Sequence, residues 1–173
     1  MINFLDKIIK RTDNLDYVAK RIKSLSKDTP VKKIFNSINN FSFTSEIRYV
    51  GGCIRKIIKK EQVEDIDLAT NLNPKQVCEA LKNNNINYYE TGIKHGTITA
   101  VIDGYVFEIT SLREDLETDG RHANVKFSTD WKKDASRRDL TINAIYSDIM
   151  GNLFDPFNGK EDLNNGKDSS MAT

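Results

Sequence analysis

The sequence lacks a long apolar run, a cysteine cluster and a charge excess, and each absence excludes a class of protein. No apolar run approaches membrane-spanning length, and Asp6 and Lys7 interrupt the N-terminal apolar residues, so no secretory signal is indicated. Cys53 and Cys78 show no metal-ligand spacing and indicate a reducing compartment. We therefore expect a cytoplasmic protein, although the basic, amphipathic first helix leaves organelle targeting open.

The charge balance limits how the chain can bind nucleic acid. Its 26 Lys and Arg against 25 Asp and Glu give a formal net charge of +1. A generally basic nucleic-acid coat is excluded, so any RNA binding must come from local patches. The 173 residues are enough for one domain, or one domain plus a fragment.

Residues 1–45 are expected to form an N-terminal helical arm. Four apolar residues recur there at helical spacing, namely Leu15, Val18, Ile22 and Leu25. Thr29 and Pro30 then predict the start of a second helix. We interpret this arm as a packing element that covers one side of a sheet.

From Ile47 onward, predicted strands and helices alternate. Strands are expected over 47–50, 86–89, 97–102, 105–110 and 139–147, and helices over about 75–82 and 131–138. Asp103-Gly104 is a favoured hairpin turn. Residues 112–127 are polar without a clear period, which predicts a mobile loop over a site.

The rest of the chain is organised around residues 47–69. A strand runs into Gly51 and Gly52 and then into a short basic helix, which leaves backbone N–H groups free for an anion. Asp65 and Asp67 alternate with apolar residues, so on a strand both carboxylates face one side. A phosphate cradle beside paired carboxylates is what nucleotidyl transfer with a divalent ion requires.

The aspartate pair gains specificity from a third acidic residue. Two aspartates on an exposed strand face are more often plain solvated residues, by about two to one. Glu108, however, lies in another alternating strand, so a third carboxylate can lie beside the pair. Three carboxylates repel one another unless a cation resides there, typically Mg²⁺.

Each basic residue near these carboxylates allows two interpretations. Arg55 lies one turn into the basic helix, within reach of a phosphate, or belongs to an ordinary solvated basic face. Arg138 can bind phosphate, and Asp139 can accept hydrogen bonds from ribose hydroxyls. Alternatively, both residues belong to a surface salt-bridge cluster. For His95, substrate contact or plain loop structure outweighs metal ligation.

Together the segments VGGCIRK, EDIDLAT, KDASRRDLTINAIY and LFDPFNGKEDL resemble the head domain of class II tRNA nucleotidyltransferases. These are the CCA-adding enzymes and their relatives, the bacterial poly(A) polymerases; the ETDGRHA and RRD segments are closer to the CCA-adding members. The resemblance covers roughly residues 47–165. It implies an α+β fold: a mixed, mostly antiparallel sheet of about five strands flanked by helices, preceded in the sequence by the N-terminal helical arm.

The resemblance also assigns residues. The implied catalytic set, whose two aspartates bind Mg²⁺, is Asp65, Asp67 and Glu108. The implied nucleotide-binding set is Gly51, Gly52, Arg55, Arg138 and Asp139. The implied reaction is attack of a tRNA 3′-hydroxyl on the α-phosphate of CTP or ATP, with pyrophosphate leaving.

Two departures from the family pattern shape the expectation. Lys56 stands where many members carry Asp, and no base-selecting helix follows Leu163. We expect a helical arm at 1–45, a catalytic head at 46–157, and a truncated neck or tail at 158–173, with poor activity of the isolated chain. The alternatives are poly(A) addition, a non-catalytic nucleotide- or RNA-binding module that needs a separate neck and body, and a structural protein.

Overall fold

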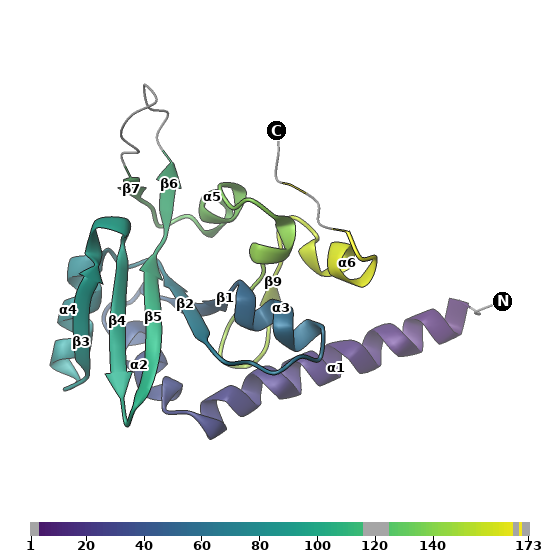
Figure 1. The fold of residues 1–173 in the computed structure, drawn as a ribbon, viewed down its shortest axis with the longest axis horizontal. Helices are drawn as coiled ribbons and strands as arrows, with labels where there is room; N and C mark the ends of the chain where they lie inside the picture. Colours follow the sequence, from purple (N-terminus) through teal and green to yellow (C-terminus); the bar gives the residue numbers. More distant parts are fainter. Residues whose placement is uncertain (1–3, 116–124, 168–169, 171–173) are drawn as a thin grey trace.

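Seven strands form one sheet that organises the molecule (Figure 1). The computed structural model describes residues 4–115, 125–167 and 170. The strand order is β3-β4-β5-β2-β1-β8-β9; β2 and β5 run parallel, and the other neighbours are antiparallel. The bounds are β1 Ile47–Val50, β2 Ile66–Thr70, β3 Asn87–Gly92, β4 Thr97–Ile102, β5 Tyr105–Ser111, β8 Tyr146–Ser147 and β9 Leu153–Phe154. The predicted α+β class is confirmed, with seven strands in the sheet where the resemblance implied about five, and the short strand expected at Leu153-Phe154 is β9.

One face of this sheet carries the main core. Inward positions alternate along each strand, as in Ile98 and Ala100 of β4 and Phe107 and Ile109 of β5, which are all buried. The core cluster is completed by apolar side chains of the helices α1 Phe4–Asp28, α2 Val31–Asn39, α3 Gly52–Ile58 and α4 Pro74–Asn83. The helices cover this face, so the side chains that point away from the main core lie on the opposite face of the sheet.

The predicted helices of residues 1–45 are confirmed as α1 and α2 (Figure 1). Val18, Ile22 and Leu25 are buried in the main core, whereas Leu15 is 46% exposed. The arm therefore shares a core with the sheet, as a packing element does. The division at residues 46 and 158 stays a prediction.

The opposite face holds a smaller core where α5 (Trp131–Ser136) covers β1 and β2. Val50 and Ala69 pack there with Ala135 of α5 and with Tyr146. The predicted helix over 131–138 is confirmed, and its start is fixed by the Asp130 carboxylate, which accepts from the N–H groups of residues 132 and 133. This second core fixes α5 beside the carboxyl-bearing strands.

The strand predicted over 139–147 is wrong for most of its length. A 3₁₀ turn, η2 (Thr141–Asn143), occupies the segment, and β8 begins only at Tyr146. The N–H of Ala144 bonds the carbonyl of Thr141, so the backbone satisfies itself locally instead of pairing in the sheet. Ala144 packs into the smaller core and Ile145 into the main one, so apolar composition here reflects a crossing between layers.

The ends of the predicted loop 112–127 are strands. β6 (Arg113–Asp115) and β7 (Val125–Phe127) pair antiparallel as a separate two-stranded ribbon. Glu114 lies opposite Lys126, and such pairs of opposite charge stabilise neighbouring strands. Because charged residues occur on both faces of the ribbon, its sequence does not show the clear alternation of apolar and polar residues that indicates a strand. The middle of the segment, residues 116–124, lies outside the described residues.

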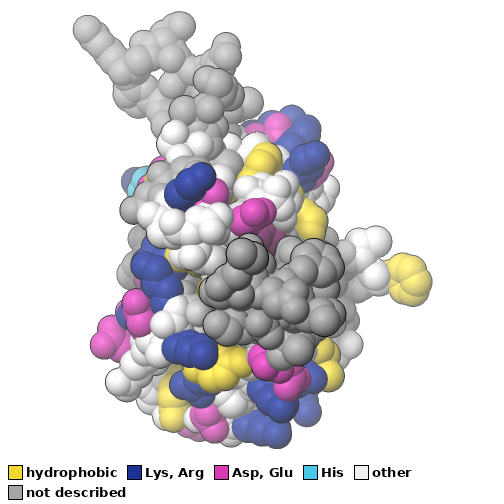
Figure 2. Space-filling model, turned by 90° about the vertical axis from the view of Figure 1, so that its right-hand side faces the viewer, with side chains coloured by type: hydrophobic (Ala, Val, Ile, Leu, Met, Phe, Trp, Pro, Cys, Tyr) yellow, Lys and Arg dark blue, Asp and Glu magenta, His cyan; other side chains and the backbone are white. Residues whose placement is uncertain are grey.

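The described surface is mixed in charge. On the face shown in Figure 2, basic and acidic side chains intermingle rather than gather by sign. Among the helices of the described residues, none is long and apolar enough to cross a membrane.

Candidate active site

Two carboxylates lie side by side on the sheet face that points away from the main core. Asp67 of β2 and Glu108 of β5 are direct partners in the parallel register, so their side chains leave the sheet on the same side. Asp67 is half-buried and Glu108 is exposed. The strand placement of Asp65 is wrong: the pairing with β5 begins at Ile66, and Asp65 lies exposed in the preceding loop.

These carboxylates concentrate negative charge at one place. Burial raises the pKa of Asp67 above its ordinary value, and the charges of Glu108 and Asp65 raise this pKa further, while Arg138 opposes the shift. No three His, Cys, Asp or Glu side chains of the described residues enclose a metal position by themselves. Mg²⁺ in nucleotide sites uses one or two carboxylates plus substrate phosphates and water, so this open oxygen set fits such an ion.

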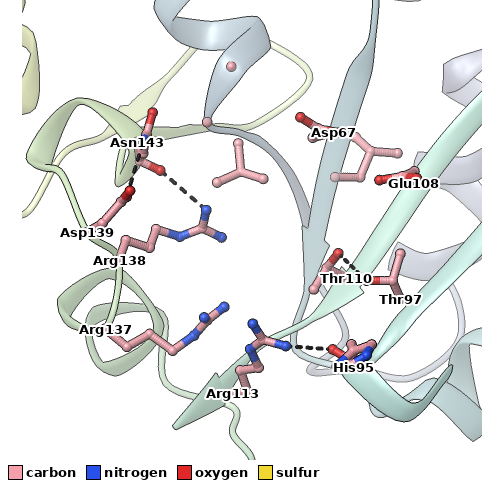
Figure 3. Close-up of a pocket in the computed structure, with 14 residues that line it drawn as sticks. Asp67, His95, Thr97, Glu108, Thr110, Arg113, Arg137, Arg138, Asp139 and Asn143 are labelled. Atoms are coloured by element: carbon pink, nitrogen blue, oxygen red, sulfur yellow. Dashed lines mark hydrogen bonds between the residues drawn. The ribbon is translucent and has the colours of Figure 1, made fainter. Parts of the chain in front are cut away.

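The carboxylates line a cavity of about 510 Å³. Figure 3 shows Asp67 and Glu108 on one side of the cavity and the guanidinium groups of Arg137 and Arg138 directed into it from the other side, with Arg113 at its lower edge beside His95. The remaining lining residues come from the glycine turn, β1, β2, η1 (Ile93–His95), β4, β5 and the segment around η2: Val50, Gly51, Gly52, Leu68, His95, Thr97, Thr110, Asp139 and Asn143. The cavity thus places carboxylates opposite guanidinium groups.

The arginine side of the cavity is rigidly built. Arg138 donates through Nε to the Tyr146 hydroxyl at 3.0 Å and through Nη1 to the Asn143 carbonyl at 3.3 Å. Arg138 and Arg137 also share the carboxylate of Asp134, whose side chain is 1% exposed. A solvated surface salt-bridge cluster does not describe residues buried to this degree.

The segments that line the cavity lie within a stretch of the chain that matches a known protein family. A model of the poly A polymerase head domain family matches residues 47–167. The chain belongs to this family. The family resemblance seen in the sequence motifs is thereby confirmed.

Named relatives of this head domain are CCA-adding enzymes. CCA tRNA nucleotidyltransferase 1, mitochondrial, of Homo sapiens is 50% identical over 123 residues, which are 70% of this chain and 28% of that protein. The CCA-adding enzyme of Oceanobacillus iheyensis is 39% identical over 117 residues, which are 66% of this chain and 28% of that protein. The chain therefore spans less than a third of the length of these relatives.

A solved structure shares the fold of the head domain. The Bacillus stearothermophilus CCA-adding enzyme in complex with CTP superposes with a TM-score of 0.70 at 27% identity, covering 83% of this chain and 34% of that one. A tRNA nucleotidyltransferase complexed with a primer tRNA and an incoming ATP analog gives a TM-score of 0.54 at 22% identity, covering 83% of this chain and 36% of that one. The second likeness concerns the fold alone.

The glycine turn of this head domain brings backbone close to the carboxylates. Gly51 has φ +68° and ψ −121°, a conformation that favours glycine, and its N–H bonds the Ile145 carbonyl at 3.2 Å. A Cβ built on Gly52 would lie 3.9 Å from a carboxylate oxygen of Asp67. Gly51 and Gly52 therefore both line the cavity next to the metal-ligand candidate.

Arg55 of the head domain points elsewhere than the sequence suggested. Its Nη1 donates to the Asn143 side-chain oxygen at 2.7 Å, and it is not among the lining residues. The Asn143 amide donates in turn to Asp139 at 3.2 Å, and this bond lowers the pKa of the exposed Asp139. Arg55 thus links α3 to η2 and supports the cavity wall through Asn143, while Lys56 pairs with Glu64 at 3.1 Å.

The site sets implied by the sequence leave out Arg113, Arg137 and Asn143, which line the cavity, and His95, which the sequence had offered only as a substrate contact or a loop residue. Arg137 stands beside Arg138 and could have been found from the repeated arginine. His95 and Arg113 meet through a bond from Arg113 Nη1 to the His95 carbonyl at 2.8 Å, which joins segments that no local pattern connects. Asn143 was hidden inside the segment misread as a strand.

Proposed function

We propose that this chain is the catalytic head of a CCA-adding tRNA nucleotidyltransferase, which transfers CMP and AMP from CTP and ATP to the 3′ end of tRNA. The observation that carries the proposal is the cavity, in which Asp67 and Glu108 face Arg137 and Arg138. Poly(A) addition is not favoured, because the relatives of known activity are named CCA-adding enzymes. The cytoplasmic placement stays a prediction, and the human relative is named mitochondrial.

The residues take roles that follow from their positions. Asp67 and Asp65 would hold Mg²⁺ with Glu108 beside them, and the bound ion would supply positive charge to the attacking and leaving oxygens. Arg138 would bind the triphosphate, together with Arg137 and the backbone of Gly51 and Gly52.

Asp139 and Arg55 act at the edge of the same wall. Asp139 is exposed at the rim of the cavity and can accept hydrogen bonds from ribose hydroxyls. Arg55 holds Asn143 and so keeps this wall in place. The protein contributes positioning and electrostatic stabilisation rather than a covalent step.

A head-swap experiment tests the function. Residues 47–167 of this chain would replace the matching head of the human relative, and the chimaera would be assayed with tRNA that lacks its CCA end. We expect CMP and AMP incorporation by the chimaera, and far less by the 173-residue chain alone, because binding energy from the tRNA body positions the 3′ end. Repeated AMP addition, or a folded chimaera without incorporation, would contradict the proposal.

The two cavity glycines should respond differently to alanine. In Gly51→Ala the backbone must hold φ +68° with a side chain, which costs about 1–2 kcal/mol and lowers the Tm of the free protein. Gly52→Ala meets only an ordinary contact in the free protein, so its Tm should stay, but the methyl group occupies space beside Asp67. Thermal melts with and without Mg²⁺ and CTP should therefore show a lost nucleotide-induced shift in Gly52→Ala at unchanged basal stability. An equal nucleotide-induced shift in Gly52→Ala and the parent chain would remove Gly52 from the binding site.

A further inference from the structure

We propose that Asp134 is a positioning residue that aims the arginines of the cavity at the triphosphate of the incoming nucleotide. The inference rests on the proposed function and adds to it a residue outside the implied catalytic and nucleotide-binding sets. Asp134 lies on α5, behind the cavity wall rather than in it, and does not line the cavity. It acts on the ligand only through the side chains that it holds.

The Asp134 carboxylate is a buried centre with donors on both oxygens. Oδ1 accepts from Arg137 Nε at 3.0 Å and from the backbone N–H of Arg113 at 3.1 Å. Oδ2 accepts from the Tyr146 hydroxyl at 2.7 Å and from Arg138 Nη2 at 3.2 Å. All three cavity arginines are thus fixed to one carboxylate, two by side chain and one by backbone.

The bonds leave part of the Arg138 guanidinium group free for a ligand. A guanidinium has five N–H donors. Asp134 takes the Nε edge of Arg138, and Asn143 takes one N–H of Nη1, so one N–H on each of Nη1 and Nη2 remains. Arg137 and Arg138 are only 14% and 18% exposed, yet both guanidinium groups point into the cavity in Figure 3. A planar, fixed pair of this kind suits phosphate oxygens.

The ionised state of Asp134 is secured by the same contacts. Burial alone would raise the pKa of its carboxyl group, but the charges of Arg138 and Arg137 and the Tyr146 hydroxyl outweigh burial and lower this pKa. Asp134 therefore remains an anion at neutral pH and removes one unit of charge from the arginine side.

Charge and orientation predict opposite results for Asp134→Asn. The substitution removes a negative charge, so charge alone would tighten the binding of a polyanion. Orientation alone would weaken it, because an asparagine has only one acceptor oxygen to hold two guanidinium groups. The sign of the change in affinity thus separates a positioning role from a mere charge effect.

The experiment measures binding of CTP and of CMP to the full 173-residue chain by calorimetry in the presence of Mg²⁺. We expect Asp134→Asn to weaken CTP binding about tenfold, as for one charge-assisted hydrogen bond, and CMP binding less than about twofold. Unchanged or tighter CTP binding, or an equal loss for both nucleotides, would overturn the proposal. If the parent chain itself does not bind CTP, the proposed function fails instead.

Two further variants guard against a folding effect. Tyr146→Phe removes one hydroxyl from the same centre but keeps the carboxylate, and it should lower the CTP-to-CMP preference about threefold. If Asp134→Asn does not fold, this variant decides, and an unchanged preference contradicts the proposal. Ser37→Ala is the matched control: it deletes a buried hydrogen bond to the Ala80 carbonyl, far from the cavity, and should leave the preference unchanged.

Discussion

Asp67→Asn should abolish nucleotide incorporation by the head-swapped enzyme while the protein stays folded. Asp67 is the half-buried member of the carboxylate pair and stands opposite Arg138 across the cavity. A Lewis-acidic ion stabilises transition-state charge by several kcal/mol, so loss of its ligand should lower the incorporation rate by about 10³-fold or more. Single-turnover incorporation of CMP at saturating CTP and Mg²⁺ measures this loss.

The same variant should melt no lower, and in Mg²⁺-free buffer should melt higher, than the parent chain. A carboxyl group whose folded pKa is raised is disfavoured as an anion, so ionised Asp67 destabilises the fold at pH values above that pKa. Asparagine removes the charge, and a gain of about 1 kcal/mol corresponds to roughly 2–4 °C in Tm.

A control variant separates the site from general charge loss. Asp103→Asn removes an exposed carboxylate at the β4–β5 turn, where asparagine tolerates the φ of 50°, and should keep full activity. If Asp67→Asn retains more than about a tenth of the parent rate, Asp67 does not carry the metal-dependent step.

The parts of the site that sequence could predict are those set by local periodicity. Glu108 lies in a strand whose apolar neighbours alternate, and the parallel partner at the same level is Asp67. Gly51 was predicted from adjacent glycines at the end of a strand, and its positive φ explains why glycine suits that position. Period and turn chemistry are local properties, and a single sequence records them directly.

The parts that sequence missed depend on side chains meeting across the fold. Arg55 reads as a phosphate ligand by its spacing from the glycines, but Asn143 captures it from 88 residues away. Asp134 lies in the KDASRRDLTINAIY segment, but the sequence does not show which groups its carboxylate holds, because Arg113 and Tyr146 reach it from other elements. The apolar residues after Asp139 indicated a strand, but Ala144 packs into the smaller core and Ile145 into the main core.

The η2 segment gives the second large effect that we expect. Gly159 begins α6 (Gly159–Asn164) and packs directly on η2: a Cβ there would overlap the carbonyl oxygen of Thr141 and lie 2.6 Å from its carbonyl carbon. Backbone cannot yield as a flexible side chain can. Gly159→Ala should therefore destabilise the fold by about 3 kcal/mol, or roughly 6–12 °C in Tm.

This substitution should also weaken nucleotide binding, because η2 carries a wall of the cavity. The Thr141 hydroxyl donates to Asp162 of α6 at 2.7 Å, so a displaced α6 pulls on the turn that ends at Asn143. Asn143 in turn holds Arg55 and Asp139. Thermal melts and CTP titration below the lowered Tm measure the two effects separately. Glu161→Ala, an exposed change in the same helix, should alter neither. A Gly159→Ala chain that melts like the parent would show that α6 is not packed on η2 as described, and the support of the cavity by this helix would fall with it.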